Sequence, residues 1–294
     1  VYMVREGLFD DVDFTIDWHP DDVNSAAART TLANRSAKFR FSGVSAHAAG
    51  APERARSALD GVEAMNMMVN LMREHPSLNT RIHYVITKGG LAPNVVPDAA
   101  VVFYYVRHSD ADEVKALWER LEATAKGAAL GTGTTVDWEI IHGNNPKLVN
   151  ETLQKVLDVK LQEMGGFSYT EEEQGWAAQL SESLGRAALP LDESTRVQPY
   201  DLTLGYGSTD VGDVSWATPT VSLRAATWVP GTSSHSWQSA AASGHSIGAK
   251  GASYAAKAMA VICLGEEPQQ APTIRASSST NWRANPAIRS GPAS

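Results

Sequence analysis

Several features that mark common protein classes are scarce in this sequence. It contains one cysteine, Cys263, among 294 residues, which excludes an internal disulfide framework and a cysteine-rich zinc module. The neighbours of Cys263 are apolar, and they predict a buried thiol. So little cysteine is typical of a reducing compartment, and we expect the protein to be cytoplasmic.

Long apolar runs and excess positive charge are also missing. No apolar stretch approaches the roughly 20 residues that cross a bilayer, and the first residues do not have the form of a signal peptide. Lys and Arg number 25 against 33 Asp and Glu, giving a formal net charge of -8, and no basic run occurs. Neither a membrane nor a nucleic acid is therefore expected as a partner. A hydrophobic content of 43% with 20% charged residues is typical of a protein that forms a core.

Near the start of the chain, residues 12–19 alternate between apolar and polar side chains, which is the period of a β-strand. Pro20 is expected to end this strand. Because a residue before proline is held extended, His19 is predicted to lie at the strand's C-terminal tip, where open α/β sheets place their ligands.

From about residue 36 the pattern becomes strand, helix, strand, strand, helix, strand. The expected strands are residues 38–45, 81–88, 100–107 and 134–141. Apolar stripes at residues 58–72 and 114–125 predict the two helices, the second closed by Gly131 to Gly133. This order predicts a ferredoxin-like α+β domain at residues 36–143.

Such an insertion would leave residues 1–35 and 144–265 to meet in space as one domain. After Pro146 we expect a helix that ends at Gly165-Gly166, a second helix opened by a capping box from Thr170 to Glu173, a buried strand at residues 219–229 and a single small-residue helix at residues 239–264. Residues 266–294 show no periodicity and are predicted to be mobile. The acidic run Glu171–Glu173 has a catalytic interpretation, but the first turn of a helix favours acidic residues for its dipole, and we prefer that explanation.

Five short motifs, taken in order, resemble one enzyme family. They are Val1–Pro20, Phe41–Pro52, Gly89–Pro97, Ser208–Trp216 and Gly231–Gln238. Together they are similar to the dizinc aminoacylase, carboxypeptidase and amidohydrolase family, from the first residue to about residue 265. The resemblance implies an α/β/α zinc-hydrolase catalytic domain interrupted by a ferredoxin-like lid that also forms a homodimer. It further implies that the N-terminal part of the catalytic domain, with the other metal ligands and the general-base glutamate, is absent from this chain.

The resemblance implies that His19 and His235 are metal ligands. Neutral imidazole is a good zinc ligand, and Asp17, on the same strand face as His19, is a candidate to orient it. Two zinc ions per intact subunit are expected, although manganese and cobalt accept the same ligands. Considered alone, either histidine has an ordinary structural or surface interpretation.

Further motif positions are implied to contact substrate. His47 matches a lid histidine that acts on the partner subunit's site, where it polarises the scissile carbonyl. The expected substrate-binding residues are Asn94, Arg107, Asp210, Gly231 and Thr232. Arg107 offers a planar fork for a carboxylate, but an arginine that caps a sheet edge is an equally good interpretation. Asn94 has an alternative as an Asx-turn before Pro97, and the loop of Asp210 as ordinary turn chemistry.

The function implied is hydrolysis of the amide bond of an N-acyl or N-aroyl amino acid, with p-aminobenzoyl-glutamate the favoured substrate. The alternative is a non-catalytic dimerisation or small-molecule-binding module, because this chain shows no general base. Selectivity among acyl-amino acids lies in the shape of a pocket, which no motif encodes.

Overall fold

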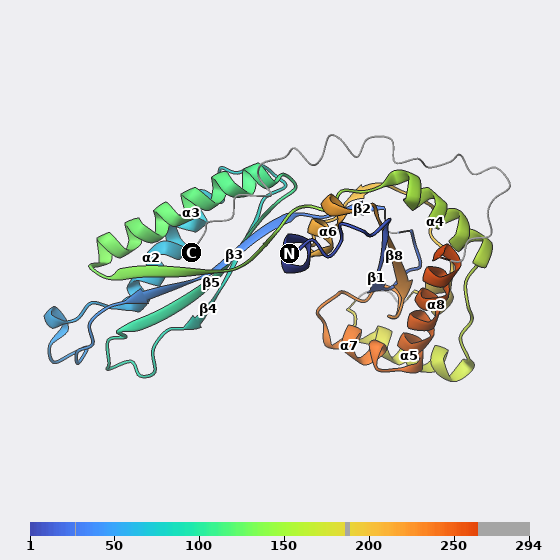
Figure 1. The fold of residues 1–294 in the computed structure, drawn as a ribbon. Coiled ribbons are helices and arrows are strands. Elements are labelled where there is room, and N and C mark those ends of the chain that lie inside the picture. Colours follow the sequence, from blue (N-terminus) through green and yellow to red (C-terminus); the bar gives the residue numbers. More distant parts are fainter. Residues whose placement is uncertain (27, 186–188, 264–294) are drawn as a thin grey trace. The chain divides into compact units, whose positions relative to one another are not determined.

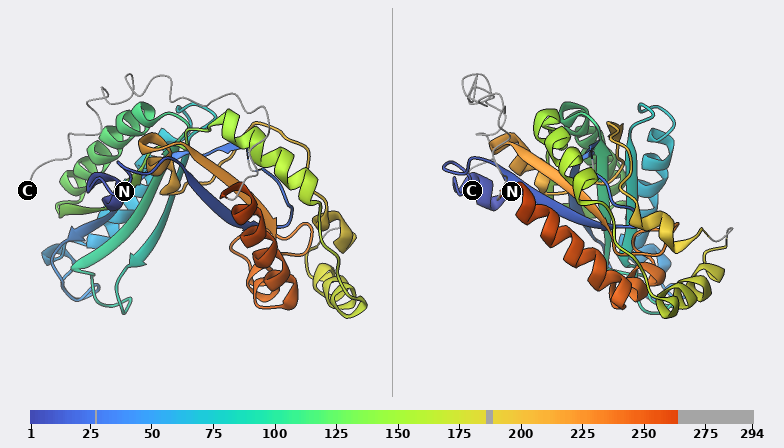
Figure 2. Two further views of the ribbon diagram at one scale, coloured as in Figure 1. Left: turned by 45° about the vertical axis from the view of Figure 1, so that its right-hand side comes forward. Right: turned by 90° about the vertical axis from the view of Figure 1, so that its right-hand side faces the viewer.

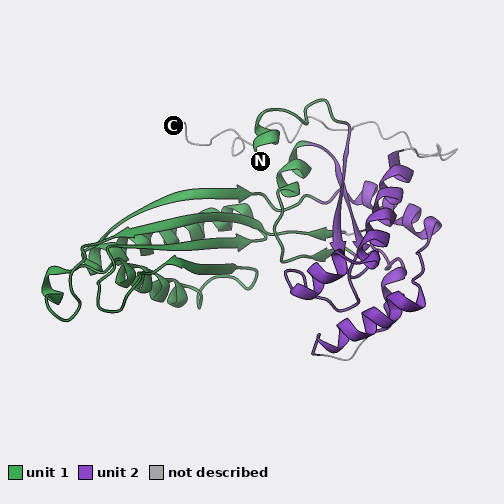
Figure 3. Ribbon diagram, turned by 90° about the horizontal axis from the view of Figure 1, so that it is seen from below, with its two compact units in different colours: residues 1–12, 29–148, 202–217 green, residues 13–28, 149–201, 218–294 purple. Residues whose placement is uncertain are grey.

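The computed structural model describes residues 1–26, 28–185 and 189–263, and the predicted mobile tail at residues 266–294 lies outside them. The chain divides into two compact units (Figure 3). Unit 1 comprises residues 1–12, 29–148 and 202–217, and unit 2 comprises residues 13–28, 149–201 and 218–294. In the described residues, no helix combines the length and the apolar character that a membrane span requires.

Unit 1 is built around an antiparallel four-stranded sheet in the order β4-β5-β3-β6. Its strands are β3 (Ala33–Ser42), β4 (Arg81–Lys88), β5 (Ala99–His108) and β6 (Thr135–Asn144). Helices α2 (Ala58–Met72) and α3 (Ala111–Thr132) cover one face of this sheet (Figure 1). The arrangement is ferredoxin-like and confirms the predicted order of strands and helices.

The two helices form where the sequence supplies stripes and caps. The Ser57 side chain accepts a hydrogen bond from the Asp60 backbone at the start of α2, and Gly133, with a φ of 67°, ends α3 in the left-handed region. Their apolar stripes bury Val62 and Leu121 completely in a core shared with alternate residues of β5. Each such side chain contributes about 1.5–3 kcal/mol by leaving water.

Short elements complete unit 1. They are α1 (Tyr2–Arg5), β2 (Arg29–Thr30), the 3₁₀ turn η1 (Pro52–Arg54), β7 (Thr203–Leu204) and α6 (Val211–Ala217). Strands β2 and β7 pair in parallel, which joins the segment at residues 202–217 to this unit.

Unit 2 is organised by a parallel pair of strands from opposite ends of the chain. Strand β1 (Thr15–Asp21) pairs with β8 (Thr220–Ala226). The helical elements are α4 (Glu151–Met164), α5 (Glu171–Glu182), the 3₁₀ turn η2 (Leu191–Thr195), α7 (Trp237–Ser243) and α8 (Ser246–Cys263). Helices α4 and α8 lie against the strand pair (Figure 2) and share a buried core with it. Gly251 permits the close approach of α8, since a Cβ there would lie 2.2 Å from the Ala226 carbonyl oxygen.

Three expectations for unit 2 are wrong. Strand β1 runs through Pro20 to Asp21, because β1 has β8 as its one neighbour in the described sheet and proline is tolerated on an edge strand. The predicted single helix at residues 239–264 is two helices separated at Gly244 and His245. The thiol of Cys263 is exposed, because it ends α8 on the side away from the buried stripe that includes Tyr254 and Ala258.

The capping box at the start of α5 is confirmed, and it accounts for Glu173. The Thr170 hydroxyl accepts from the Glu173 backbone N–H, while the Thr170 N–H donates to the Glu173 carboxylate. The same buried carboxylate accepts from the Ser246 hydroxyl at 2.7 Å and forms an ion pair with Lys250. Burial raises the pKa of Glu173, but the bonds from Lys250, Ser246 and Thr170 outweigh it and lower the pKa to about 2. The acidic residue in this turn therefore joins α5 to α8.

Candidate metal and substrate sites

His19 lies near the carboxyl end of β1 with an exposed side chain. Its Nδ1 is 2.6 Å from the Pro20 carbonyl oxygen, which can only accept, so Nδ1 carries the proton and donates. This tautomer leaves the lone pair on Nε2, the form in which imidazole binds a metal. Asp17, two residues earlier, projects from the same face of the strand and is half-buried.

His235 lies in the loop that follows β8. Because β1 and β8 are parallel, their carboxyl ends meet at one edge of the pair. His235 has a φ of 59°, and among the described residues it is the single non-glycine residue in the left-handed region. Such a conformation costs about 1–3 kcal/mol and is concentrated at functional sites. The Ser236 side chain then caps α7 and fixes the end of the loop.

Two acidic residues that sequence reasoning missed hold this loop to the end of β1. The Asp21 carbonyl accepts from the backbone N–H groups of Thr227 and Trp228, and its carboxylate pairs with Arg224 at 2.6 Å. The Asp22 carboxylate accepts from the Gly231 N–H at 2.6 Å. Burial, with the adjacent Asp21 charge adding to it, raises the pKa of Asp22 against the opposing Gly231 bond. The adjacent acidic residues Asp21 and Asp22, just after Pro20, were the sequence signal for this connection.

Gly231 and Thr232 therefore differ in whether they have a hydrogen-bonding group available for a ligand. The Gly231 N–H is already bonded to Asp22. Thr232 is 6% exposed, and its hydroxyl has no hydrogen-bond partner among the described residues. A buried hydroxyl without a partner costs about 1–3 kcal/mol, so Thr232 has unused hydrogen-bonding capacity beside the His235 loop.

The candidate metal ligands in unit 2 are of a suitable chemical type, but they are too few to form a complete metal site. Imidazole with a free Nε2 lone pair suits zinc, and His19 and the His235 loop reach the same strand edge. In the part of the chain that the structure describes, however, no group of three His, Cys, Asp or Glu side chains is placed to hold one ion. His19 and His235 are thus candidates for part of a coordination shell.

In unit 1 the structure brings the His47 and Asn94 loops together. The Ala48 N–H donates to the Asn94 carbonyl at 3.0 Å, and the Val96 N–H donates to the Ala46 carbonyl. The exposed His47 ring accepts at Nδ1 from the backbone N–H groups of Ala49 and Gly50, at 3.2 and 3.0 Å. Since Nδ1 accepts, the proton of the neutral ring lies on Nε2. His47 therefore presents an N–H donor to solvent from a fixed loop.

Arg107 and Asp210 also belong to unit 1. The Arg107 guanidinium lies over the Tyr105 ring, with its Cζ 5.1 Å from the ring centroid, and burial lowers its pKa. Asp210 is exposed before α6, and its carbonyl accepts from the Asp213 N–H. Asp213 is the buried acid of this motif, and it accepts from the backbone and side chain of Asn145. No feature of the local sequence indicates that Asp213, rather than Asp210, is the buried acidic residue.

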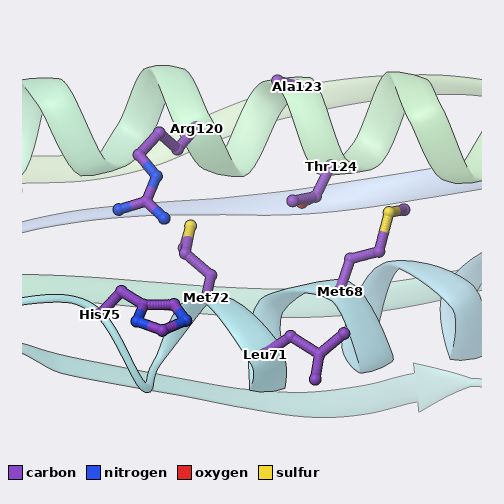
Figure 4. A pocket seen from close by; sticks show the side chains of 7 residues that line it. All are labelled: Met68, Leu71, Met72, His75, Arg120, Ala123 and Thr124. Carbon is purple, nitrogen blue, oxygen red and sulfur yellow. The ribbon is translucent and has the colours of Figure 1, made fainter.

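Two hollows lie on unit 1. One, of about 600 Å³, is bounded by the loops that carry His47 and Asn94, with lining residues that include Ala48, Leu91 and Val95. The other, of about 400 Å³, is a groove between α2 and α3 (Figure 4). The groove is lined by Met68, Leu71, Met72, His75, Arg120, Ala123 and Thr124, and it contains none of the predicted site residues.

Comparison with known proteins gives consistent similarities. Residues 33–133 match the M20 peptidase dimerisation domain. The chain is 36% identical to a subunit of p-aminobenzoyl-glutamate hydrolase from Escherichia coli over 289 residues, covering 90% of this chain and 60% of that protein. It is 30% identical to the Xaa-Arg dipeptidase of Mus musculus over 137 residues, covering 47% of this chain and 32% of the dipeptidase.

A solved structure shows the same fold. The aminobenzoyl-glutamate utilization protein from Klebsiella pneumoniae superposes with a TM-score of 0.56 at 17% identity, covering 92% of this chain and 59% of that one. The chain therefore spans about 60% of the length of the aminobenzoyl-glutamate proteins that it matches.

Proposed function

We propose that the chain belongs to the M20 family of peptidases and amidohydrolases and is part of a metal-dependent amidohydrolase. The proposed reaction is hydrolysis of the amide bond of an N-acyl or N-aroyl amino acid. The favoured substrate is p-aminobenzoyl-glutamate, which would give p-aminobenzoate and glutamate. The similarity to the p-aminobenzoyl-glutamate hydrolase of Escherichia coli supports this choice.

The observation that carries the proposal is the arrangement at the carboxyl ends of β1 and β8. His19 has a free Nε2 lone pair there, and Asp21 and Asp22 tie the His235 loop to the same edge. We assign His19 and His235 as two ligands of a zinc centre, with Asp17 as a group that orients His19. When bound, zinc would polarise the amide carbonyl and lower the pKa of water, and manganese or cobalt would serve the same role.

In the proposed reaction His47 donates a hydrogen bond to the carbonyl oxygen of the scissile amide in the site of a partner subunit. Its Nε2–H is oriented for donation because two backbone N–H groups occupy Nδ1. A fixed donor aimed at developing negative charge stabilises the transition state, and such a donor accounts for about 10²–10³ in rate. Asn94, on the loop bonded to that of His47, would contact the substrate together with Arg107.

The remaining assignments follow from the same proposal. Thr232 would donate its hydroxyl to the substrate, and Gly231 and Asp210 would form parts of the wall around it. We assign residues 1–35 and 144–265 to the catalytic domain and residues 36–143 to the lid through which a homodimer would form. The match to a peptidase dimerisation domain at residues 33–133 supports the lid assignment. A cytoplasmic location stays a prediction.

One observation favours a second function. The described residues contain no group of three metal-binding side chains, so a module that binds an acyl-amino acid without hydrolysing it is the alternative.

The experiment that tests the proposal measures zinc binding and release of p-aminobenzoate by the full chain. The variants are His19→Ala and His235→Ala, with His75→Ala as control because His75 is an exposed histidine of unit 1. We expect each ligand variant to lose at least about tenfold in zinc affinity and the control to lose none. Equal zinc affinity in all four proteins would remove the ligand assignment. Binding of p-aminobenzoyl-glutamate without p-aminobenzoate release at saturating zinc would favour the binding module.

A further inference from the structure

Two arginines face each other on the side of the unit 1 sheet that its helices leave open, the side seen in Figure 3. Arg81 of β4 and Arg107 of β5 are directly opposed in the antiparallel register. Their neighbours Ile82 and Val106 point to the helical side and are buried in the core. The two arginines therefore project from the same open face, with Cα atoms about 4.5–5.5 Å apart.

Like charges directly opposite one another destabilise a strand pair. Neither guanidinium forms an ion pair with any residue that the structure describes. The acidic residues of the same face, Asp137 and Glu139, lie further along β6, where both pair with Arg40. The charge of the arginine pair thus has no balancing group in its own surroundings.

Each guanidinium is nevertheless held in place. Arg81 donates from Nη1 to the carbonyls of Leu78 and Thr80, both at 2.7 Å, and its Cζ lies 4.7 Å from the centre of the Tyr206 ring. Arg107 is held by its stacking on Tyr105. Its Nε is buried without a hydrogen-bond partner. The pair is therefore pre-oriented, and N–H groups of both arginines remain unused.

The residues beside the pair are polar but carry no negative charge. Asn34 lies opposite Arg107 on β3, and its amide contacts the His142 ring at 2.8 Å. His83 lies two residues after Arg81, and burial together with the charge of Arg107 lowers its pKa. The histidines thus add little positive charge near neutral pH, and recognition of an anion falls to the two arginines.

We propose that Arg81 and Arg107 together bind the two carboxylates of an acidic amino acid, so that Arg81 selects an N-acyl glutamate or aspartate over a neutral N-acyl amino acid. The carboxyl carbons of extended glutamate are about 5 Å apart by ordinary bond lengths, so a ligand lying across the two strands would present one carboxylate to each arginine. Arg107 takes the α-carboxylate, as in the proposed function, and Arg81 takes the side-chain carboxylate. The inference deepens that function and rests on it for the acyl-amino acid and for the role of Arg107.

The test measures binding of N-acetyl-L-glutamate and N-acetyl-L-glutamine to the full chain by isothermal titration calorimetry. The two ligands have the same size and differ in one charge. The buffer is depleted of metal ions by resin, because carboxylates also bind metals. The variants are Arg81→Gln, Arg81→Lys and Arg107→Gln, and the matched control is Arg120→Gln, an exposed arginine of α3. Thermal unfolding of each variant checks that it is folded.

We expect the wild-type chain to prefer N-acetyl-glutamate by about tenfold or more, as for a charge-assisted bidentate contact. Arg81→Gln should abolish this preference while its affinity for N-acetyl-glutamine stays within about twofold, and Arg81→Lys should restore part of it. Arg107→Gln should weaken both ligands, and Arg120→Gln neither.

Three results would overturn the proposal: equal wild-type affinities, a preference that survives in folded Arg81→Gln, or no binding of either ligand below about 10 mM. An Arg81 that only caps the turn at residues 77–80 would give the second result. Amide hydrolysis without selectivity for acidic amino acids would leave the proposed function standing and this inference refuted. Glutamate-selective binding without amide hydrolysis would support this inference and refute the proposed function.

Discussion

Replacing Glu173 with glutamine should destabilise unit 2 without touching the chemistry of the proposed site. The side chain is 5% exposed and joins the first turn of α5 to α8 through Thr170, Ser246 and Lys250. Glutamine keeps the size of the side chain and loses its charge. The lost ion pair leaves Lys250 without its anion, and the amide nitrogen cannot accept the bonds that one carboxylate oxygen accepts.

The magnitude follows from the lowered pKa. A carboxyl group whose pKa falls from 4.5 to about 2 on folding contributes about 3 kcal/mol at neutral pH before screening. The Lys250 side chain is 34% exposed, so water screens the pair and the expected loss for Glu173→Gln is about 1–2 kcal/mol. Because the folded pKa is depressed, this stabilisation is complete above pH 4.5. It disappears as the pH falls from 4.5 towards 2.

The assay is urea unfolding, followed by circular dichroism, at pH 7 and at steps down to pH 2.5. Glu172→Gln is the control, since Glu172 is an exposed neighbour in the same helical turn and its loss changes the net charge equally. Glu172→Gln should stay within about 0.5 kcal/mol of wild type at every pH. Equal stabilities of the Glu173 and Glu172 variants at pH 7, or a gap between them that does not narrow below pH 4.5, would refute the reasoning.

Two further predictions concern close packing and a half-buried histidine. Gly251→Ala should lose about 2–4 kcal/mol of unfolding free energy in the same urea assay, because its Cβ would lie 2.2 Å from the Ala226 carbonyl oxygen. The control Gly127→Ala should gain about 0.5–1 kcal/mol, because its Cβ would meet only Met68 Cε, at 3.8 Å. Burial and the charge of Arg107 lower the pKa of His142, so the folded wild type should lose stability as the pH falls below 6.5. His142→Gln should flatten the pH dependence of thermal unfolding between pH 7.5 and pH 5, with His83 supplying the slope that remains. An unchanged slope would count against a neutral, half-buried His142 ring.

The sequence predicted the ferredoxin-like sheet well because each of its elements has a local signal. The stripes of α2 and α3 follow the helical period, and Gly133 stops α3 where the chain needs the left-handed region. Alternation in β5 is complete along the strand. For such segments, local preference and tertiary packing demand the same structure.

The break between α7 and α8 had no comparable signal. Residues 239–243 are small and compatible with one continuous helix, so the break at Gly244 and His245 depends on contacts made elsewhere. The Trp228 indole donates to Ser243, and the His245 ring stacks on Trp176 with centroids 4.2 Å apart. Both partners are distant in sequence, and tertiary contact overrides helix propensity here.

The sequence indicated which residues belong to the candidate site, but it did not indicate which of them contact one another. The order of the motifs predicted that His19 and His235 lie on neighbouring segments. The hydrogen bond from the Gly231 N–H to the Asp22 carboxylate, however, depends on the register of β1 against β8. The opposition of Arg81 and Arg107 likewise exists only once β4 and β5 are in register. A shift of one residue would turn every side chain of a strand to the other face.

The pairing of Thr15 with Thr220 joins residues 205 positions apart, and this separation affects how the chain folds. In the four-stranded sheet Asn34 lies opposite Asn144, so the polypeptide enters and leaves that sheet at adjacent points. Once the sheet has formed, the loop that remains to be closed is about half as long, and each halving lowers the closure entropy by about 0.6 kcal/mol. Folding of the inserted sheet thus lowers the entropic cost of pairing β1 with β8, the two strands that it separates in sequence.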